Sequence, residues 1–236
     1  MIITVENNKG GVGKTTTTIN LAKSLIEKNN NVLIIDMDSQ ANISRYFNIQ
    51  SEVSLYEVVR DNVELPLYKS EYVSNNKPYE VDILASSFNL FEIDNDFKEP
   101  IINIIKHLAK NYDYVLIDGT PALGKLFDIC LSVADYILIP TKTETMSLSG
   151  ALTTYELAKA KGIQKIGILF NQVREKTEVY RQIKQEVDSL EIRENIIKIA
   201  IPYSTIFEKQ ITNNDMELQK RYKNLYNMLS YEITKV

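Results

Sequence analysis

The stretch Lys9-Gly-Gly-Val-Gly-Lys-Thr-Thr16 decides the fold of this 236-residue chain. Before it, residues 1–5 form a short apolar and β-branched run that is typical of a buried strand. After it, residues 17–28 carry apolar side chains at helical spacing. The glycines therefore lie on a turn from a strand into a helix, which is the context that a phosphate-binding loop requires.

The residue types of this loop indicate its chemistry. Gly10, Gly11 and Gly13 allow backbone conformations that other residues rarely adopt, so successive N–H groups can converge on phosphate oxygens. The following helix directs its positive dipole end at the same anion. The Lys14 ammonium can reach the β- and γ-phosphates, and the Thr15 hydroxyl can bind Mg²⁺. The predicted nucleotide-binding residues of the loop are Lys9, Gly10, Gly11, Val12, Gly13, Lys14, Thr15 and Thr16.

The loop departs from the ordinary pattern G-x-x-x-x-G-K-[ST], because Asn8 replaces the first glycine and Lys9 adds a second lysine. In this form, N-x-K-G-G-x-G-K-T-T, it resembles the deviant Walker A loop of the ParA/MinD superfamily of ATPases. The resemblance implies ATP and Mg²⁺ as ligands and an ATP-sandwich homodimer, in which Lys9 touches the nucleotide of the partner subunit. The spacing alone predicts only a phosphate loop. Lys9 and Lys14 are candidate catalytic residues.

An acidic residue ends the apolar run Tyr114–Asp118. A carboxylate at that position can hold Mg²⁺, usually through water, because Mg²⁺ keeps much of its hydration shell. The Walker B segment of the family usually reads Asp-x-Pro-Pro, whereas here Gly119 and Thr120 precede a single Pro121. Asp118 is retained, and the loop after it differs.

A second acidic segment reads Asp36-Met-Asp38-Ser-Gln-Ala-Asn42 and resembles the switch segment Asp-x-Asp-Pro-Gln-x-Asn of the family, with Ser39 in place of proline. We expect its two carboxylates to face different groups. By resemblance, Asp38 positions or activates the attacking water and Asp36 supports the Mg²⁺ shell. The predicted metal-binding residues are Thr15, Asp36 and Asp118.

Apolar strand-like runs alternate with helical ones along the rest of the chain. The predicted strands are residues 32–36, 81–85, 114–118, 136–140, 166–170 and 197–201. Near-continuous apolar strands are typical of a parallel sheet that is covered on both faces. The sequence therefore predicts an α/β fold, a doubly wound and mostly parallel sheet with helices on both faces, of the P-loop NTPase class. Ligands of such sheets bind beyond the carboxyl ends of the strands.

We expect one ATPase domain, residues 1–236, with an insertion at about 48–78. Within the insertion, Ser54–Asp61 is a candidate short helix and Ser74–Pro78 a candidate loop. A C-terminal helix is predicted at about 217–233. Its apolar stripe is consistent with packing on the core, or with a membrane-surface helix like that of MinD-type proteins.

Two residues after late strands are candidates for reading the base. Asn171 follows the strand 166–170, and its amide can pair with an adenine edge. Pro202 lies in a segment that resembles the Ile-Pro segment beside the base in the family. Each residue is also consistent with a strand-end turn.

A local group of cations follows Asn171 and predicts a DNA surface. Arg181 and Lys184 share a helix face, and such cations hold phosphates without reading bases. The interleaved Glu175, Glu178 and Glu186 are equally typical of a solvated mixed-charge helix. The candidate DNA residues are Arg174, Lys176, Arg181 and Lys184, and the next candidates are Lys220, Arg221 and Lys223.

Composition excludes several classes of protein. The net charge of −4 excludes a chain that is basic overall, so a nucleic-acid surface would be a local patch. The single cysteine, Cys130, permits no intrachain disulfide and no Cys₄ metal site, and we expect it to be buried on a helix. The single histidine, His107, receives no catalytic role. No apolar run is long enough to span a membrane and no secretory pattern opens the chain, so a cytoplasmic location is expected, on the nucleoid when ATP is bound.

The sequence as a whole predicts a Mg²⁺-dependent ParA-type ATPase. In this interpretation an ATP-dependent homodimer binds DNA non-specifically and partitions a plasmid or chromosome with a ParB-like centromere-binding protein, with no membrane involved. One alternative is a MinD-like ATPase that positions cargo on a membrane. Another is a P-loop metabolic enzyme that transfers phosphate to a small substrate.

Overall fold

The computed structural model describes residues 1–51, 53–188, 191–207, 209 and 218–235. The strands are β1 Ile2–Val5, β2 Val32–Asp36, β3 Tyr68–Ser74, β4 Lys77–Leu84, β5 Tyr114–Asp118, β6 Tyr136–Thr141 and β7 Ile166–Phe170. The α-helices are α1 Lys14–Ile26, α2 Asn42–Tyr46, α3 Leu55–Asp61, α4 Asn95–Leu108, α5 Lys125–Val133, α6 Thr145–Ala160, α7 Glu178–Asp188 and α9 Lys220–Thr234. Short 3₁₀ helices span Phe88–Glu92, Ala109–Asn111 and Glu191–Asn195.

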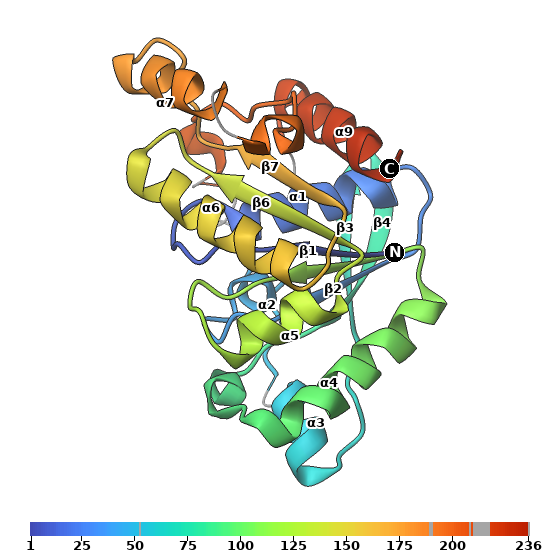
Figure 1. The fold of residues 1–236 in the computed structure, drawn as a ribbon. Coiled ribbons are helices and arrows are strands. Elements are labelled where there is room, and N and C mark those ends of the chain that lie inside the picture. The colour runs from blue at the N-terminus through green and yellow to red at the C-terminus, as the bar shows by residue number, and fades with distance from the viewer. Residues whose placement is uncertain (52, 189–190, 208, 210–217, 236) are drawn as a thin grey trace.

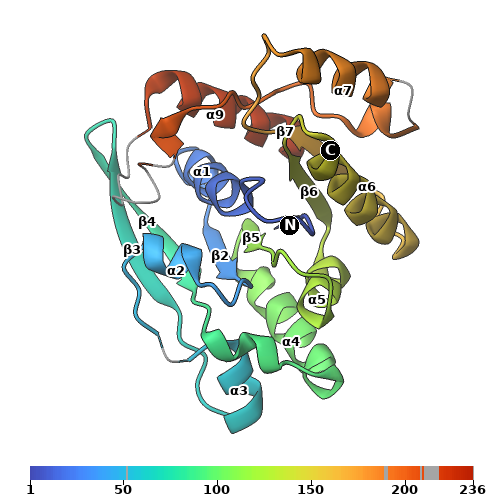
Figure 2. The ribbon, with the colours of Figure 1, turned by 90° about the vertical axis from the view of Figure 1, so that its left-hand side faces the viewer.

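The strands form one seven-stranded sheet in the order β3-β4-β2-β5-β1-β6-β7. All neighbouring pairs are parallel except β3 and β4. Helices α1 and α9 cover one face, and α4, α5 and α6 cover the other (Figures 1 and 2). The predicted doubly wound α/β fold is confirmed, whereas the assignment of residues 1–236 to a single domain stays a prediction.

Adjacent strand residues supply the two cores, because side chains alternate between the faces of a sheet. Ile3 and Ile34 pack beneath α1, whereas Ile2 and Leu33 pack beneath α4 and α5. Both faces are apolar, so these strands read as continuous apolar runs. The carboxyl ends of the five central parallel strands meet at one edge, which carries the phosphate loop.

The insertion forms more regular structure than predicted. The candidate short helix is present as α3, where Ser54 and Glu57 make a reciprocal capping box. The predicted loop Ser74–Pro78 is wrong: Asn75 and Asn76, both with positive φ, make a two-residue turn between β3 and β4. Pro78 fits within β4 because β2 pairs with that strand only from Asp82 onward, so the missing N–H is not needed there.

The predicted strand Ile197–Ile201 is also wrong. The segment runs beside β7 and makes only isolated bridges, because the Ile197 N–H donates to Ile168 and the Ile201 N–H to Phe170. Between these two hydrogen bonds the segment advances by four residues while β7 advances by two. A regular hydrogen-bond ladder cannot continue across such a bulge.

The C-terminal helix packs on the core, as one of its two interpretations predicted. Tyr222, Tyr226, Leu229 and Ile233 of α9 are buried against α1 and its surroundings. The Lys223 ammonium pairs with Glu27 at 2.7 Å, and the Ser24 hydroxyl donates to Asn227 at 2.7 Å. Residue 217, the predicted start of the helix, lies outside the described residues. No helix among the described residues is long and apolar enough to cross a membrane.

Candidate nucleotide and metal site

The phosphate loop joins β1 to α1 at the carboxyl edge of the sheet. Gly11 and Gly13 have φ values of 71° and 94°, which side-chain-bearing residues rarely adopt. The φ of Gly10 does not lie in that range, so its predicted conformational role is not required here. No side chain caps the start of α1 and its first turn holds no acid. The N–H groups there remain available to an anion.

The Lys14 ammonium is held by the backbone of the loop. Its Nζ donates to the carbonyl oxygens of Asn7 at 2.9 Å and Lys9 at 3.1 Å, and the side chain is almost completely buried. An ammonium has three donors, so one remains for a phosphate oxygen. The loop curls around this cation, which concentrates positive charge where a phosphate would lie.

Asn171 braces the loop from the end of β7. Its Nδ2 donates to the Val12 carbonyl at 3.0 Å, and the Gln172 side chain donates to the Gly11 carbonyl at 3.1 Å. A Cβ on Gly13 would overlap the Asn171 amide, so the two fit only with glycine there. The role of Asn171 in reading a base stays a prediction.

An open cavity of about 400 Å³ lies beside the segment that follows Asn171. Gln172 and Tyr203, the neighbours of Asn171 and Pro202, both line it. Pro202 itself forms a bridge with Val173. The sequence neighbours of the two predicted base-reading residues thus line one cavity, whereas Asn171 and Pro202 themselves are not among its lining residues.

Asp118 connects the end of β5 to the first turns of α1. Its Oδ2 accepts from the Thr15 hydroxyl at 2.7 Å and its Oδ1 from the Thr18 hydroxyl at 3.1 Å. Asp118 and Thr15, two of the three predicted metal-binding residues, are therefore in direct contact. Thr18 was missed by sequence analysis, although it lies one helical turn beyond Thr15.

Asp36 and Asp38 face different groups, as expected. Residues two apart on an extended strand share a face, so this divergence depends on the end of β2 at Asp36. Asp36 accepts from the N–H and hydroxyl of Ser44, on α2, at 3.1 and 3.0 Å. Asp38 accepts from the Gln40 N–H at 3.0 Å in a local turn, while the Ser86 hydroxyl holds its carbonyl. Ser44 and Ser86 were not identified from the sequence.

Burial perturbs the carboxyl groups of this edge. It raises the pKa of Asp36 to about 7, and burial together with the charge of Asp36 raises the pKa of Asp118 to about 8. Burial likewise raises the pKa of Glu6 to about 8, against the opposing effect of Lys14. A cation placed among these carboxyl groups would favour their ionised forms.

Magnesium fits this donor set. The hydroxyl of Thr15 and the carboxylates of Asp36 and Asp118 are the hard oxygen ligands that Mg²⁺ prefers. Within the described ranges, no cluster of three or more histidine, cysteine, aspartate or glutamate side chains could hold a metal. Phosphate and water oxygens would have to complete the shell, as is usual for Mg²⁺ bound with a nucleotide.

Comparison with known proteins decides the family. Residues 1–168 match the model of a family described as an AAA domain. The chain is 31% identical over 214 residues to the chromosome partitioning protein ParA of Myxococcus xanthus, covering 85% of this chain and 75% of that protein. This chain belongs to the ParA/MinD superfamily of partition ATPases.

Solved structures of the superfamily superpose along the whole chain. A candidate plasmid partition protein of Borrelia burgdorferi bound to AMPPNP is 27% identical, with a TM-score of 0.81 over 100% of this chain and 99% of that one. The pNOB8 ParA bound to nonspecific DNA has a TM-score of 0.74 and 21% identity, covering 99% of this chain and 97% of that one. The latter likeness shows the fold alone.

The distinctive lysine of this ParA/MinD loop lies against α6. The Lys9 side chain is partly buried, and a Cβ on Gly150 would overlap its Cγ. Gly150 therefore allows the loop and α6 to approach closely. Of the remaining predicted nucleotide-binding residues, Gly10 lies in the same loop and is exposed, and Thr16 lies in the first turn of α1 and is partly buried. The contact of Lys9 with a second subunit stays a prediction.

The predicted DNA residues lie on and before α7, at the same edge of the molecule. All four are exposed. Arg181 pairs with Glu178 at 2.9 Å, and the Arg174 guanidinium lies 4.1 Å from the centre of the Tyr203 ring. The alternative patch 220–223 is weaker than expected, because Lys223 is engaged with Glu27 and Ser74.

Proposed function

We propose that this chain is a Mg²⁺-dependent ParA-type ATPase of DNA partition. It closes as a homodimer around ATP, binds DNA without sequence preference, and releases DNA after a ParB-like centromere-binding partner stimulates hydrolysis. The observation that most directly supports ATP and Mg²⁺ binding is that Lys14, the uncapped start of α1 and the Thr15–Asp118 pair lie together at the carboxyl edge of the sheet. The family membership supports the partition role, and a cytoplasmic, nucleoid-associated location follows from it.

In this proposal each group of the edge has a role in phosphoryl transfer. Lys14 neutralises the β- and γ-phosphates, while Thr15, Asp118 and Asp36 hold the Mg²⁺ shell. Asp38 orients the attacking water. Phosphoryl transfer needs mainly positioning and neutralisation of charge, so one such carboxylate with a metal is sufficient for slow hydrolysis.

Lys9 is the residue that would link nucleotide to dimer. We expect Lys9→Ala to weaken ATP-dependent dimerisation more than it weakens ATP binding by the monomer, because its ammonium serves the partner's phosphates. Light scattering with a non-hydrolysable ATP analogue measures the dimer, and calorimetry measures ATP binding. Lys142→Ala, which removes a lysine near Gly11, is a matched control. An undiminished dimer in Lys9→Ala would reduce Lys9 to a loop lysine with no role between subunits.

The exposed cations on and before α7 support the DNA surface. Exposed lysine and arginine side chains hold phosphates without reading bases, and a dimer doubles their number. The nonspecific DNA in the pNOB8 ParA structure makes the same kind of ligand reasonable here.

The packing of α9 argues against the MinD-like alternative. A membrane-binding helix must present its apolar stripe to lipid. The stripe of α9 is instead buried against α1, and Lys223 and Asn227 fasten it there. Membrane binding through α9 would require this helix to leave the core.

Two assays with ATP separate the proposals. We expect gel retardation of unrelated DNA fragments with equal affinity when ATP is present, and little retardation with ADP. Sedimentation with anionic liposomes should leave the protein in the supernatant. ATP-dependent sedimentation without DNA retardation would replace the partition proposal by the MinD-like one.

A further inference from the structure

Glu6 is a buried acid at the centre of the site that the roles above do not use. It follows β1 directly, and none of its surface is exposed. Its Oε1 accepts from the Asn7 N–H at 2.8 Å, and the backbone N–H of Thr120 also acts on the carboxyl group, although Oε2 makes no hydrogen bond of normal geometry in the described part of the chain. A buried oxygen without a partner costs free energy, so some other benefit must keep this side chain in place.

The Glu6 carboxyl group occupies the space that a side chain at position 119 would fill. A Cβ on Gly119 would overlap Glu6 Oε2 and would lie 2.8 Å from Oε1. The φ of Gly119 is outside the left-handed region, so its backbone does not require glycine. Glycine is therefore required for room, and Glu6 takes that room.

The loop that begins at Gly119 has lost other restraints. The family pattern after the aspartate has two prolines, each of which fixes a backbone angle. Here Thr120 replaces the first of them, and Gly119 adds conformational freedom. The Gly119 N–H donates to the Val5 carbonyl at 3.0 Å, which pins one side of the loop to β1. Glu6 presses on the other side.

We propose that Glu6 is a positioning residue, whose side chain packs on Gly119 and holds the loop 119–121 in the conformation that sets Asp118 and Thr120 at the phosphate site. This inference rests on the proposed ATPase activity. Asp118 and Thr120, the residues on either side of Gly119, are both buried. A loop displaced by even ~1 Å would lower the rate of phosphoryl transfer more than it lowers nucleotide affinity.

The test is a cycle of substitutions at the two positions. We expect Glu6→Ala to lower kcat about 10-fold while KM for ATP stays within about threefold, because the loop 119–121 loses its packing while the carbonyls of Asn7 and Lys9 still hold the Lys14 ammonium. Gly119→Ala should lower kcat as well, by collision with Glu6. The kcat of the double variant relative to the wild type should be at least about threefold higher than the product of the relative kcat values of the two single variants. The reason is that the methyl group added at position 119 then fills the space that Glu6 leaves.

Conservative and control variants separate positioning from stability. Glu6→Gln keeps the volume and the acceptor for Asn7, so it should restore most of the activity that Glu6→Ala loses. Glu57→Ala removes another buried glutamate, which binds Ser54 and Asn89 away from the phosphate loop. It should lower the thermal midpoint without the selective loss in kcat. If Glu6→Ala does not fold, Glu6→Asp takes its place in the cycle, because it withdraws the carboxyl from Gly119 by one methylene.

The inference would be overturned by a wild-type kcat in Glu6→Ala, or by effects at the two positions that are independent of each other. It would also be overturned if Glu6→Ala lost kcat only together with ATP affinity and thermal midpoint, which would indicate a general loss of stability like that expected for Glu57→Ala. A wild-type protein that hydrolyses no ATP would instead contradict the proposed function. In that case the thermal midpoints of the wild type, the two single variants and the double variant decide the Glu6–Gly119 pairing. The pairing would then be refuted if the thermal midpoint of the double variant falls by as much as, or more than, the two single variants together.

Discussion

The phosphate loop and helix α7 both present cations at the carboxyl edge of the sheet, and they hold them in opposite ways. Lys14 is buried, and two backbone carbonyls fix its ammonium. Arg181 is 66% exposed and pairs with an equally exposed glutamate. A fixed, buried cation selects one phosphate position, whereas exposed cations attract any phosphate backbone and contribute little to stability. This difference is what we expect between the proposed nucleotide site and the proposed DNA surface.

The largest effect is expected at the fixed cation. Lys14→Ala should lower ATP affinity roughly 10³-fold, because the phosphates lose a buried charge partner and the carbonyls of Asn7 and Lys9 lose their donor. Calorimetry with ATP and Mg²⁺ measures the change. Lys184→Ala, on α7, is the matched control and should bind ATP like the wild type. An unchanged affinity of Lys14→Ala for ATP would contradict the proposed nucleotide site.

A smaller effect separates binding from chemistry within the same edge. Asp38→Ala should retain ATP binding while hydrolysis falls on the order of 10²-fold, because the attacking water loses its positioning group. Phosphate release measured beside ATP affinity shows the split. The variant should accumulate as an ATP-bound dimer. Wild-type turnover would mean that another residue orients the water.

These two predictions concern residues that sequence patterns located well. The phosphate loop, Asp36 and Asp118 were predictable because each depends on a local signal, an apolar strand followed by glycines or an acid. The N–H and hydroxyl donors that hold the acids, from Ser44 and Thr18, were not, because they come from other elements. The fit of Glu6 to Gly119 depends on the pairing of β1 with β5, which no local pattern encodes. The bulge at 197–201 likewise depends on its register against β7.

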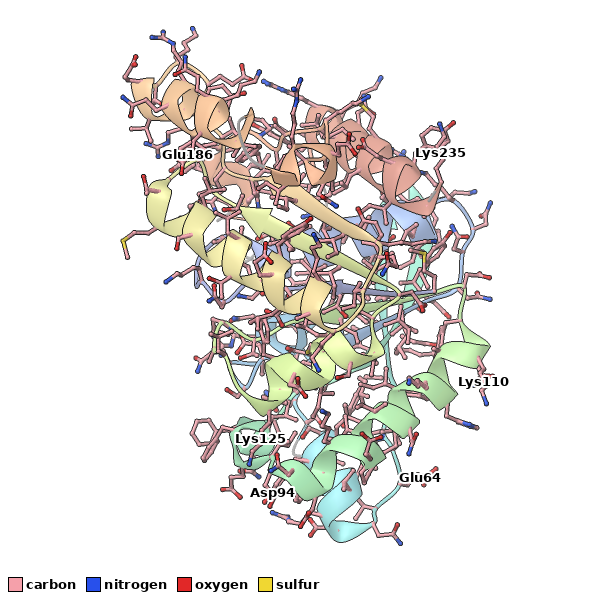
Figure 3. The ribbon with its side chains drawn as sticks, viewed as in Figure 1. Glu64, Asp94, Lys110, Lys125, Glu186 and Lys235 are labelled. Atoms are coloured by element: carbon pink, nitrogen blue, oxygen red, sulfur yellow. The ribbon has the colours of Figure 1, made fainter. Side chains whose placement is uncertain are left out.

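The exposed surface should respond to charge and salt. Arg181→Glu with Lys184→Glu should weaken ATP-dependent DNA binding about 10-fold or more at low salt and flatten its dependence on salt, because phosphate contacts are lost. Dimerisation with ATP should persist. The control is Lys106→Glu with Lys110→Glu, the same change of charge at the C-terminal end of α4, far from Glu186 and α7 (Figure 3). Equal loss in both double variants would indicate that net charge, and not this surface, controls DNA binding.

The smallest effect is a dependence of stability on pH. The folded state raises the pKa of Asp118 from 3.8 to about 8, so the folded protein binds a proton that the unfolded chain has released. The contribution of this proton to the free energy of unfolding is fully present below about pH 4 and is lost as the pH rises toward 8. Without nucleotide and Mg²⁺, the free energy of unfolding should therefore be lower at pH 8 than at pH 6 by about 1 kcal/mol or more.

Asp118→Asn should reduce this dependence, since an amide does not titrate. Glu64→Gln, at an exposed carboxylate away from the site, should leave it unchanged (Figure 3). Urea unfolding across this pH range measures both variants. Part of the slope should persist, because Asp36 and Glu6 also have raised pKa values, and a slope as steep in Asp118→Asn as in the wild type would show that Asp118 does not contribute to it.

In the proposed function, the phosphate site controls DNA binding at the exposed surface of α7. Fluorescence anisotropy of two labelled DNA fragments of unrelated sequence tests it directly, with protein alone, with ADP, and with a non-hydrolysable ATP analogue and Mg²⁺. We expect tight binding of both fragments only with the analogue, with equal affinity for the two sequences and an affinity that falls steeply with salt. The same DNA affinity in all three nucleotide states would contradict it.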